Sequence, residues 1–330
     1  MEKKSPRIVV VGGGSGSSVV LNGLVNCRVS VSAIVTMFDS GGSSGLLRKE
    51  FGLLPLGDIR QCLLALSSKE DASVRGMINV LNYRFESESS LMGHSVGNLV
   101  LAALTSIHKD LKKAIEELSA LLRVKGHVLP VTYDQANLCA RLENGDIIYT
   151  ESDIDLRSDS IPPIETVYLD HVVKVNQEAV DAINDADLVL LGPGDLYTSI
   201  IPNFLVPEIK NAISSTRACV VYAGNLMTKR GETSGYKASK FVSEVCRYSG
   251  REKLDYLILN SATLPDEVKF AYKKEKAEPV IIDEEVNNYA NNVVIKDLVK
   301  FEGTTVRHDP KLLTDEIMAF IELCSNTINE

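Results

Sequence analysis

Short apolar runs recur along this 330-residue chain, and stretches with helical patterning lie between them. The runs are continuous rather than alternating, which is typical of strands that are buried on both faces of a parallel sheet. They cover residues 7–11, 31–37, 187–192, 218–224, 255–260 and 279–283. Helical patterns cover residues 17–26, 234–250 and 264–276. We therefore predict an α/β fold with a Rossmann-like, mostly parallel sheet and helices on both faces.

One segment departs from this alternation. Asn144-Gly145 lies between two β-rich runs within residues 137–152, and both central positions of a two-residue hairpin turn favour positive φ. We expect an antiparallel hairpin near residues 135–155, as an excursion at the edge of the sheet. No internal repeat, low-complexity tract or evident linker occurs in the sequence, so we predict a single Rossmann-like domain over residues 1–330.

The composition limits the partners of the chain. A formal charge of −9 at pH 7 leaves no basic excess to replace the counterions of a nucleic acid, so we expect no nucleic-acid binding. No apolar run approaches the roughly 20 residues that a bilayer crossing needs, and the run at 7–11 is too short for a signal peptide. We therefore expect a cytoplasmic protein that does not bind membranes.

Three glycine-rich turns follow predicted strands, at the end of the sheet where open parallel sheets bind ligands. The first, "GGGSGSS" at 12–18, lets backbone N–H groups approach a phosphate at the start of a helix. The dinucleotide-binding fingerprint is incomplete because Ser17 stands at its third glycine, and the lysine of a P-loop is absent. The turn is either a phosphate cradle or a tight structural turn.

The second turn, at 39–44, places Asp39 just beyond the predicted strand at 31–37. An acidic residue at this position of a dinucleotide-binding fold contacts a ribose hydroxyl, and Asp39 could equally hold Mg²⁺ against a diphosphate. The small residues that follow would supply N–H and hydroxyl donors. The alternative is an ordinary helix N-cap, although five consecutive small residues exceed what a cap needs.

The third turn, at 192–199, has a proline between two glycines, followed by the hydroxyls of Tyr197, Thr198 and Ser199. It is either a rigid turn or a further part of the site.

Two polar pairs begin otherwise apolar helices. Asp58 and Arg60 form either a structural pair or a pair that faces a phosphate. His94 stands at a helix start, where a histidine is more often a cap than a catalyst. The amide of Asn98 lies in an apolar stripe and must find hydrogen-bond partners if it is buried.

Taken together, these motifs resemble the YvcK/CofD-like family. The matching segments include "VVGGGSGSSVVLNGL", "FDSGGSSGLLRKEFGLLPLGDIRQCLLAL", "GHSVGNLVLAAL", "GPGDLYTSIIPNFLVPEI" and "YAGNLMTKRGETSGY". The resemblance implies a Rossmann-like fold that is usually a homodimer. One branch of the family is the Mg²⁺-dependent 2-phospho-L-lactate transferase of coenzyme F420 biosynthesis. The other is the bacterial gluconeogenesis factor, whose members resemble the transferase but bind UDP-sugars.

The same resemblance implies a set of ligand-binding residues. They are Gly12, Gly13, Gly14, Ser15 and Gly16 as the phosphate cradle, Asp39, Ser40, Gly41, Gly42, Ser43 and Ser44 around a diphosphate or metal, and Asn98, Gly194, Asn225 and Thr228 completing the pocket. Tyr272 would stack on a base or sugar, and Arg307 would make a charge-assisted contact with a phosphate. The alternatives are a helix-face tyrosine and a surface arginine.

The resemblance implies two possible functions. The first is a regulatory protein without catalytic residues or a required cofactor, which binds a nucleotide sugar such as UDP-N-acetylglucosamine, is linked to cell shape and wall synthesis, and acts on an unknown protein partner. The second is a Mg²⁺-dependent transferase with Asp39 as metal ligand. The resemblance places an arginine after Gly45, where this chain has Leu46, which weakens the transferase hypothesis. A third hypothesis, a nicotinamide-dependent dehydrogenase, is the weakest because the dinucleotide-binding fingerprint is incomplete.

Overall fold

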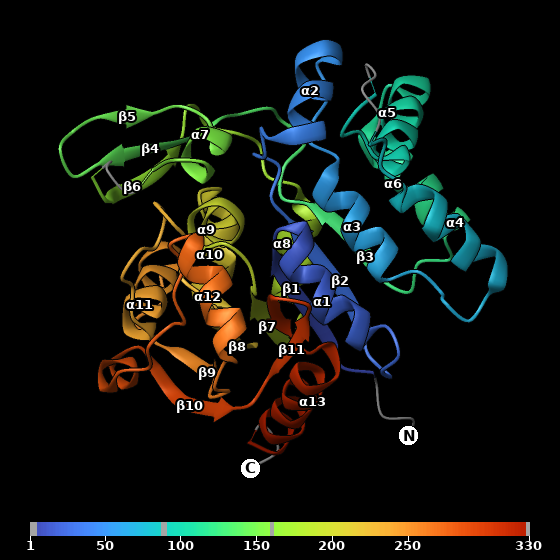
Figure 1. Cartoon of the computed structure of the whole chain (residues 1–330). Coiled ribbons are helices and arrows are strands. Elements are labelled where there is room, and N and C mark those ends of the chain that lie inside the picture. The colour runs from blue at the N-terminus through green and yellow to red at the C-terminus, as the bar shows by residue number, and fades with distance from the viewer. Residues whose placement is uncertain (1–4, 87–90, 159–161, 328–330) are drawn as a thin grey trace.

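The structure is a computed structural model that describes residues 5–86, 91–158 and 162–327. A seven-stranded sheet forms its centre, with the order β10-β9-β8-β7-β1-β2-β3 and parallel pairing between all neighbours (Figure 1). Its strands are β1 (Arg7–Gly12), β2 (Ser30–Val35), β3 (His127–Pro130), β7 (Leu188–Leu191), β8 (Cys219–Ala223), β9 (Leu254–Asn260) and β10 (Ala290–Lys296). The predicted α/β class with a mostly parallel sheet is confirmed.

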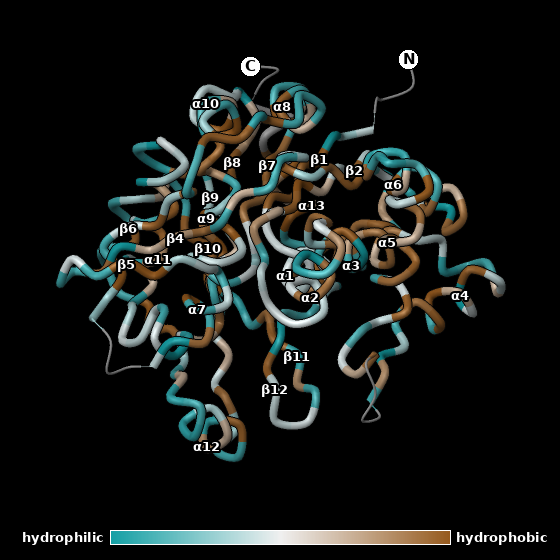
Figure 2. The backbone as a smooth tube through the Cα atoms, turned by 90° about the horizontal axis from the view of Figure 1, so that it is seen from above, coloured by the Kyte–Doolittle hydropathy of each residue, from teal (hydrophilic) through white to brown (hydrophobic). Residues whose placement is uncertain are grey.

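Helices cover both faces of this sheet. In Figure 2 the strands lie between α8 and α10 on one side and α1, α3 and α13 on the other. The bounds of the helices are α1 (Gly14–Leu24), α2 (Gly42–Phe51), α3 (Gly57–Ala65), α4 (Ala72–Asn82), α5 (Val96–His108), α6 (Leu111–Leu121), α8 (Gln177–Asn184), α9 (Ile201–Phe204), α10 (Pro207–Ser215), α11 (Ala238–Ser249), α12 (Asp266–Lys274) and α13 (Pro310–Thr327). No helix among the described residues is long and apolar enough to span a bilayer.

The continuous apolar runs form the middle of the sheet because helices cover both of its faces there, so that side chains pointing to either face are buried. All four residues of β7 are fully buried, and so are Val10 and Val11 of β1. Burying one Val or Leu side chain stabilises the fold by roughly 1.5–3 kcal/mol. The central strands therefore provide the rigid base from which the glycine-rich turns emerge.

The direction in which the chain progresses across the sheet reverses between β1 and β7. From β1 it continues through β2 to β3 on one side, and from β7 through β8 and β9 to β10 on the other. The helices that follow β1 and β7 consequently leave toward opposite faces, which opens a crevice beyond the carboxyl ends of these two strands. The first and third glycine-rich turns both lie at this crevice.

The two edge strands were not predicted from the sequence. Strands β3 and β10 carry exposed and polar side chains, so no continuous apolar run marks them. The predicted strand at 279–283 is wrong, since only Pro279 makes an isolated bridge, to Met227. This segment leads toward the short helix at Glu284–Asn288 before β10.

The hairpin at Asn144-Gly145 is confirmed, although it belongs to a separate three-stranded antiparallel sheet. This sheet has the order β5-β4-β6, with β4 (Leu138–Leu142), β5 (Ile147–Ile148) and β6 (Ile164–Leu169). Leu142 N–H donates to Asp146 C=O, so the loop has three residues rather than two. Gly145 has φ +89° whereas Asn144 is not left-handed, which is the pattern of a three-residue hairpin loop. The short helix α7 (Glu151–Asp155) follows.

The C-terminal hairpin of β11 (Val299–Glu302) and β12 (Thr305–His308) packs with α12 and apart from the main core. Leu264, Val268 and Val306 form this small apolar cluster. Figure 2 shows α12 and the hairpin projecting from the same side of the body. Both elements contribute residues to the cavity described next.

Candidate functional site

A cavity of about 750 Å³ lies at the crevice between the carboxyl ends of β1 and β7. Its walls come from the first and third glycine-rich turns, α7, the segment after β8, α12 and the C-terminal hairpin. Of the ligand-binding residues that the resemblance implies, those lining it are Gly14, Ser15, Gly16, Gly194, Asn225, Thr228, Tyr272 and Arg307. The fold thus brings together segments more than 290 residues apart in the sequence, as the numbers of Gly14 and Arg307 show.

The first and third turns are in direct backbone contact. A Cβ atom at Gly16 would lie only 2.0 Å from the carbonyl oxygen of Pro193, so no other residue fits there without moving one of the turns. Gly194 is fixed from the other side, because Asn225 Nδ2 donates to its carbonyl oxygen at 2.8 Å. Gly12 and Gly13 lie behind the cavity, and Gly13 packs between Ser199 and Asp58.

The N-terminus of α1 faces the cavity. Its N-cap is Gly13, which supplies no side-chain acceptor to the first N–H groups of the helix. Ser15 and Gly16 follow within the first turn and line the cavity. Gly14 N–H already donates to the Asp58 carboxyl, but the N–H groups of Ser15 and Gly16 and the helix dipole still favour an anionic ligand at this position.

The second glycine-rich turn does not line the cavity. Residues 39–44 instead pack against α7, α3 and α5, and several of their polar groups have protein partners. Ser40 N–H donates to Glu151 Oε2 at 3.1 Å, and Gly41 N–H donates to Asp39 Oδ1 at 2.8 Å. Two of the predicted diphosphate donors of this turn, the N–H groups of Ser40 and Gly41, therefore donate to carboxylates of the protein itself.

Asn98 likewise lies outside the cavity, in a buried polar network. Its Nδ2 donates to Ser43 Oγ at 3.1 Å, and Ser43 Oγ lies 2.8 Å from His94 Nδ1. All three side chains are almost fully buried. The network fixes the first turn of α2 against that of α5 and provides a partner for the NH₂ group of the Asn98 amide, whereas Asn98 Oδ1 is buried without a hydrogen-bond partner among the described residues.

Tyr272 and Arg307 reach the cavity from α12 and β12. The hydroxyl of Tyr272 accepts a hydrogen bond from Val306 N–H at 3.1 Å, which ties the ring to the hairpin. The side chain of Arg307 is 50 % exposed, and its Nε lies 3.6 Å from Glu302 Oε2. Such an exposed ion pair is weak, so the guanidinium remains available to a ligand.

Asp58 is a cavity residue whose importance the sequence showed only in part. It stands at the start of α3, lines the cavity and accepts a hydrogen bond from Gly14 N–H. Burial raises the pKa of its carboxyl to about 7, and the neighbouring Asp39 carboxylate adds to the increase. Asp58 and Asp39 therefore connect the cavity to the second glycine-rich turn.

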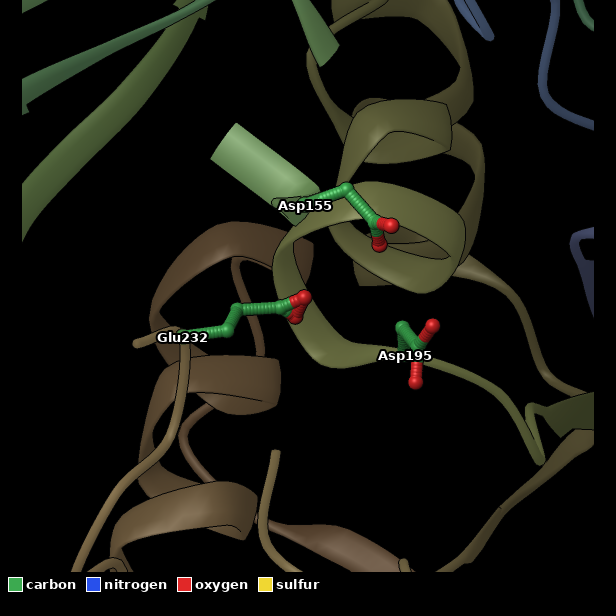
Figure 3. Close-up of side chains that lie close together, drawn as sticks. All are labelled: Asp155, Asp195 and Glu232. Carbon is green, nitrogen blue, oxygen red and sulfur yellow. The ribbon is translucent and has the colours of Figure 1, made fainter. Parts of the chain in front are cut away.

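A further polar cluster, formed by Asp155, Asp195, Lys229 and Glu232, was not found from the sequence. One oxygen of each acid lies within 4.8 Å of the others, and Figure 3 shows the three carboxyl groups converging. Lys229 Nζ is 2.7 Å from Asp195 Oδ2, contacts Asp155 Oδ1, and lies 3.9 Å from Glu232 Oε1. The ammonium of Lys229 thus supplies the cation among these carboxylates.

The charges of this cluster are strongly coupled. Burial opposes the charged form of Lys229, but Glu232, Asp195 and Asp155 outweigh it and raise the pKa of the ammonium. Burial raises the pKa of Glu232 to about 7, although the nearby Lys229 lowers it. Asp195, Lys229 and Glu232 lie within two of the segments that carry the family resemblance, and Asp155 lies on α7. The sequence missed the cluster because no spacing within one segment indicates that the three segments meet.

Helix α7 is held at both ends by polar contacts. At its start, Glu151 accepts from Ser40 N–H, and burial together with Asp39 raises the pKa of the Glu151 carboxyl to about 8. At its end, Asp155 contacts Lys229. The small antiparallel sheet is thereby fastened to the second and third glycine-rich turns.

Comparison with known proteins assigns the family. The family described as 2-phospho-L-lactate transferase CofD matches residues 8–299. The chain is 41 % identical to the gluconeogenesis factor of Halalkalibacterium halodurans, over 96 % of each chain. It is 40 % identical to the gluconeogenesis factor of Bacillus subtilis, over 93 % of this chain and 95 % of that one. The crystal structure of protein BH3568 from Bacillus halodurans superposes with a TM-score of 0.89 at 39 % identity, covering 96 % of this chain and all of the other. The chain belongs to the CofD family, in its gluconeogenesis-factor branch.

Proposed function

We propose that the protein binds a nucleotide sugar, of the UDP-N-acetylglucosamine type, as a regulatory ligand in this cavity. The observation that carries the proposal is the meeting of the N-terminus of α1, whose N-cap Gly13 offers no side-chain acceptor, with Tyr272 and Arg307 around one space of about 750 Å³. This volume lies within the range of small-molecule sites. In this role the protein would report the supply of the nucleotide sugar to a protein partner that acts in cell shape and wall synthesis.

The charges of the cavity support one orientation of the ligand. Its diphosphate would face the N–H groups at the start of α1, where a negative charge is favoured. The Arg307 guanidinium would reach the same phosphates from β12 with two parallel N–H donors. The ring of Tyr272, held by its bond to Val306, would offer a flat surface to the base.

Arg307→Ala should weaken the binding of UDP-N-acetylglucosamine roughly 10- to 100-fold, because a hydrogen bond to a charged group contributes about 1.5–3 kcal/mol. Isothermal titration calorimetry without added metal measures this directly. Arg28→Ala is the matched control, since Arg28 is exposed in the loop before β2, at the opposite end of the sheet. Unchanged affinity in Arg307→Ala, or a wild-type protein that does not bind the nucleotide sugar, would contradict the proposal.

A second candidate is a Mg²⁺-dependent transferase that acts on a nucleotide-diphosphate-linked substrate, and the Asp39–Asp58 pair favours it. The donor set fits the ion, because Mg²⁺ prefers carboxylate oxygens and Asp58 lines the cavity. The raised pKa of Asp58 beside Asp39 also indicates a place where a cation would relieve repulsion. Mg²⁺ bound there would neutralise charge on the diphosphate.

The two candidates differ in their dependence on metal. The transferase requires that GDP bind only with Mg²⁺, or that the phospholactyl group of a guanosine diphosphate conjugate be transferred to a deazaflavin alcohol with release of guanosine monophosphate. The regulator requires binding of a UDP-sugar that persists in a chelator. Titrations of the same preparation with UDP-N-acetylglucosamine and GDP, each with Mg²⁺ and with a chelator, separate them.

A further inference from the structure

The wall of the cavity beside the third glycine-rich turn carries a charged cluster with no part in the phosphate contacts described above. Asp155, Asp195 and Lys229 all line the cavity there. Resting on the proposed function, we propose that these three side chains form the subsite for the hydroxyl groups of the sugar, and that they make the protein discriminate a nucleotide sugar from a nucleoside diphosphate.

The three groups are held in place, yet they remain open to the cavity. Their side chains are 32 %, 45 % and 29 % exposed in the order Asp155, Asp195 and Lys229. Behind them, the side chain of Glu232 is fully buried and lies 3.9 Å from Lys229 Nζ. Thr198 Oγ1 donates to Glu232 Oε1 at 3.2 Å and fixes that carboxyl in turn. Glu232 is thus a positioning residue that keeps the Lys229 ammonium at the wall.

Electrostatics decides which part of the ligand this wall accepts. Two cavity-facing carboxylates and the buried Glu232 surround a single ammonium, so the charge of Lys229 is already balanced within the protein. A phosphate placed here would be repelled by Asp155 and Asp195 at short range. The phosphates are instead favoured at the start of α1 and at Arg307. The neutral part of the ligand is therefore the part that faces the cluster.

The chemistry of the cluster matches sugar hydroxyls. A hydroxyl group donates one hydrogen bond and accepts others, so it can donate to Asp155 or Asp195 while it accepts from the Lys229 ammonium. Hydrogen bonds with an ionised partner are the strong ones, and they distinguish a hydroxyl-bearing ligand from one that lacks it. A nucleoside diphosphate has no sugar in this position, so Asp155, Asp195 and Lys229 would stay hydrogen-bonded to water when it binds.

The test compares UDP-N-acetylglucosamine with UDP by isothermal titration calorimetry on the full chain. Asp195→Asn and Asp155→Asn keep the shape of the side chain and remove its charge, and Lys229→Met removes the donor. Asp266→Asn and Lys273→Met are matched controls on α12, because Asp266 has a fully exposed side chain and neither residue lines the cavity. Circular dichroism confirms that each variant is folded.

We expect Asp195→Asn to bind UDP-N-acetylglucosamine about tenfold more weakly or worse. UDP should bind to the same variant as tightly as to the wild type, or more tightly, because a negative charge has left the cavity. Asp155→Asn and Lys229→Met should lower the preference for the sugar-bearing ligand in the same way, while both controls keep it.

The outcomes separate this inference from the function on which it rests. Suppose that the wild type binds the sugar-bearing ligand. If the variants then lose affinity for both ligands equally, or keep their affinity for both, the sugar lies elsewhere and the subsite is refuted. If the wild type binds neither ligand, the proposed function itself fails. Loss of discrimination with UDP binding retained supports both.

Discussion

Gly16→Ala should destabilise the folded protein by about 3 kcal/mol and abolish ligand binding in the cavity. The added Cβ would lie 2.0 Å from Pro193 O, 2.6 Å from Pro193 C and 2.9 Å from Gly194 Cα. All three are backbone atoms, so no side-chain rotation relieves the clash. The first and third glycine-rich turns must move apart, and with them the two edges of the crevice. Urea denaturation followed by circular dichroism measures the loss of stability.

Gly76→Ala is the matched control for this change. Gly76 lies within α4, and apart from its chain neighbours and the nearby backbone of its own helix, a Cβ atom there would meet no atom within 4 Å. Alanine should therefore leave the free energy of unfolding unchanged or raise it by about 0.5–1 kcal/mol, as expected for a glycine in a helix interior. A Gly16→Ala protein as stable as the wild type would show that the two turns do not touch.

Asp58→Asn should stabilise the protein at pH 8 by about 2 kcal/mol relative to the wild type, and much less at pH 5. In the folded protein the carboxyl keeps its proton up to a pKa of about 7, whereas in the unfolded chain it loses the proton near pH 4. The folded state thus binds more protons between these values, and the stability that the neutral carboxyl contributes is lost as the pH rises through 7.

The magnitude follows from the two pKa values. Their difference corresponds to about 4 kcal/mol at most, and water in the cavity, which Asp58 lines, reduces it to about half. Asparagine keeps an oxygen that can accept from Gly14 N–H. Urea denaturation of both proteins at pH 5 and pH 8 gives the result. An advantage of the variant that is equal at both pH values would contradict the raised pKa.

An acidic residue whose ionisation destabilises the folded protein is typical of functional sites, where residues are often retained at the expense of stability. Glu151 and Glu232 have raised pKa values for the same main reason, burial, and change stability in the same direction. The wild type should consequently keep part of its pH dependence after Asp58 is replaced. A cation or a ligand donor at the cavity would offset the same repulsion.

The features that the sequence predicted well are those with local causes. Continuous burial makes β1 and β7 apolar throughout, and the close approach of Gly16 to Pro193 requires glycine, so the buried strands and the glycine-rich turns are each marked within their own segment. The edge strands β3 and β10 are half exposed and carry no such signal. The hairpin could be predicted because its loop needs a residue with positive φ, and the glycine at 145 marks that position in the sequence. The length of the loop depends instead on the pairing of Leu142 with Asp146.

The site was harder to predict because its charges meet only through the tertiary fold. Asp155, Asp195 and Lys229 lie in three segments, and no fixed spacing relates them. The second glycine-rich turn illustrates the reverse case. Its composition suits a diphosphate, but the Glu151 carboxyl on α7 already accepts from Ser40 N–H, which nothing within the turn itself could indicate.

The separation of the small apolar cluster of α12 and the C-terminal hairpin from the main core has a consequence for signalling. Leu264, Val268 and Val306 bury little area, so this unit can open with less free energy than the strands of the central sheet. A molecule that bridges Gly16 and Arg307 would couple the two units and suppress that opening. A partner protein that contacts the outer surface of the hairpin could then detect whether the cavity is occupied, because ligand binding would change how often the hairpin and α12 separate from the main core.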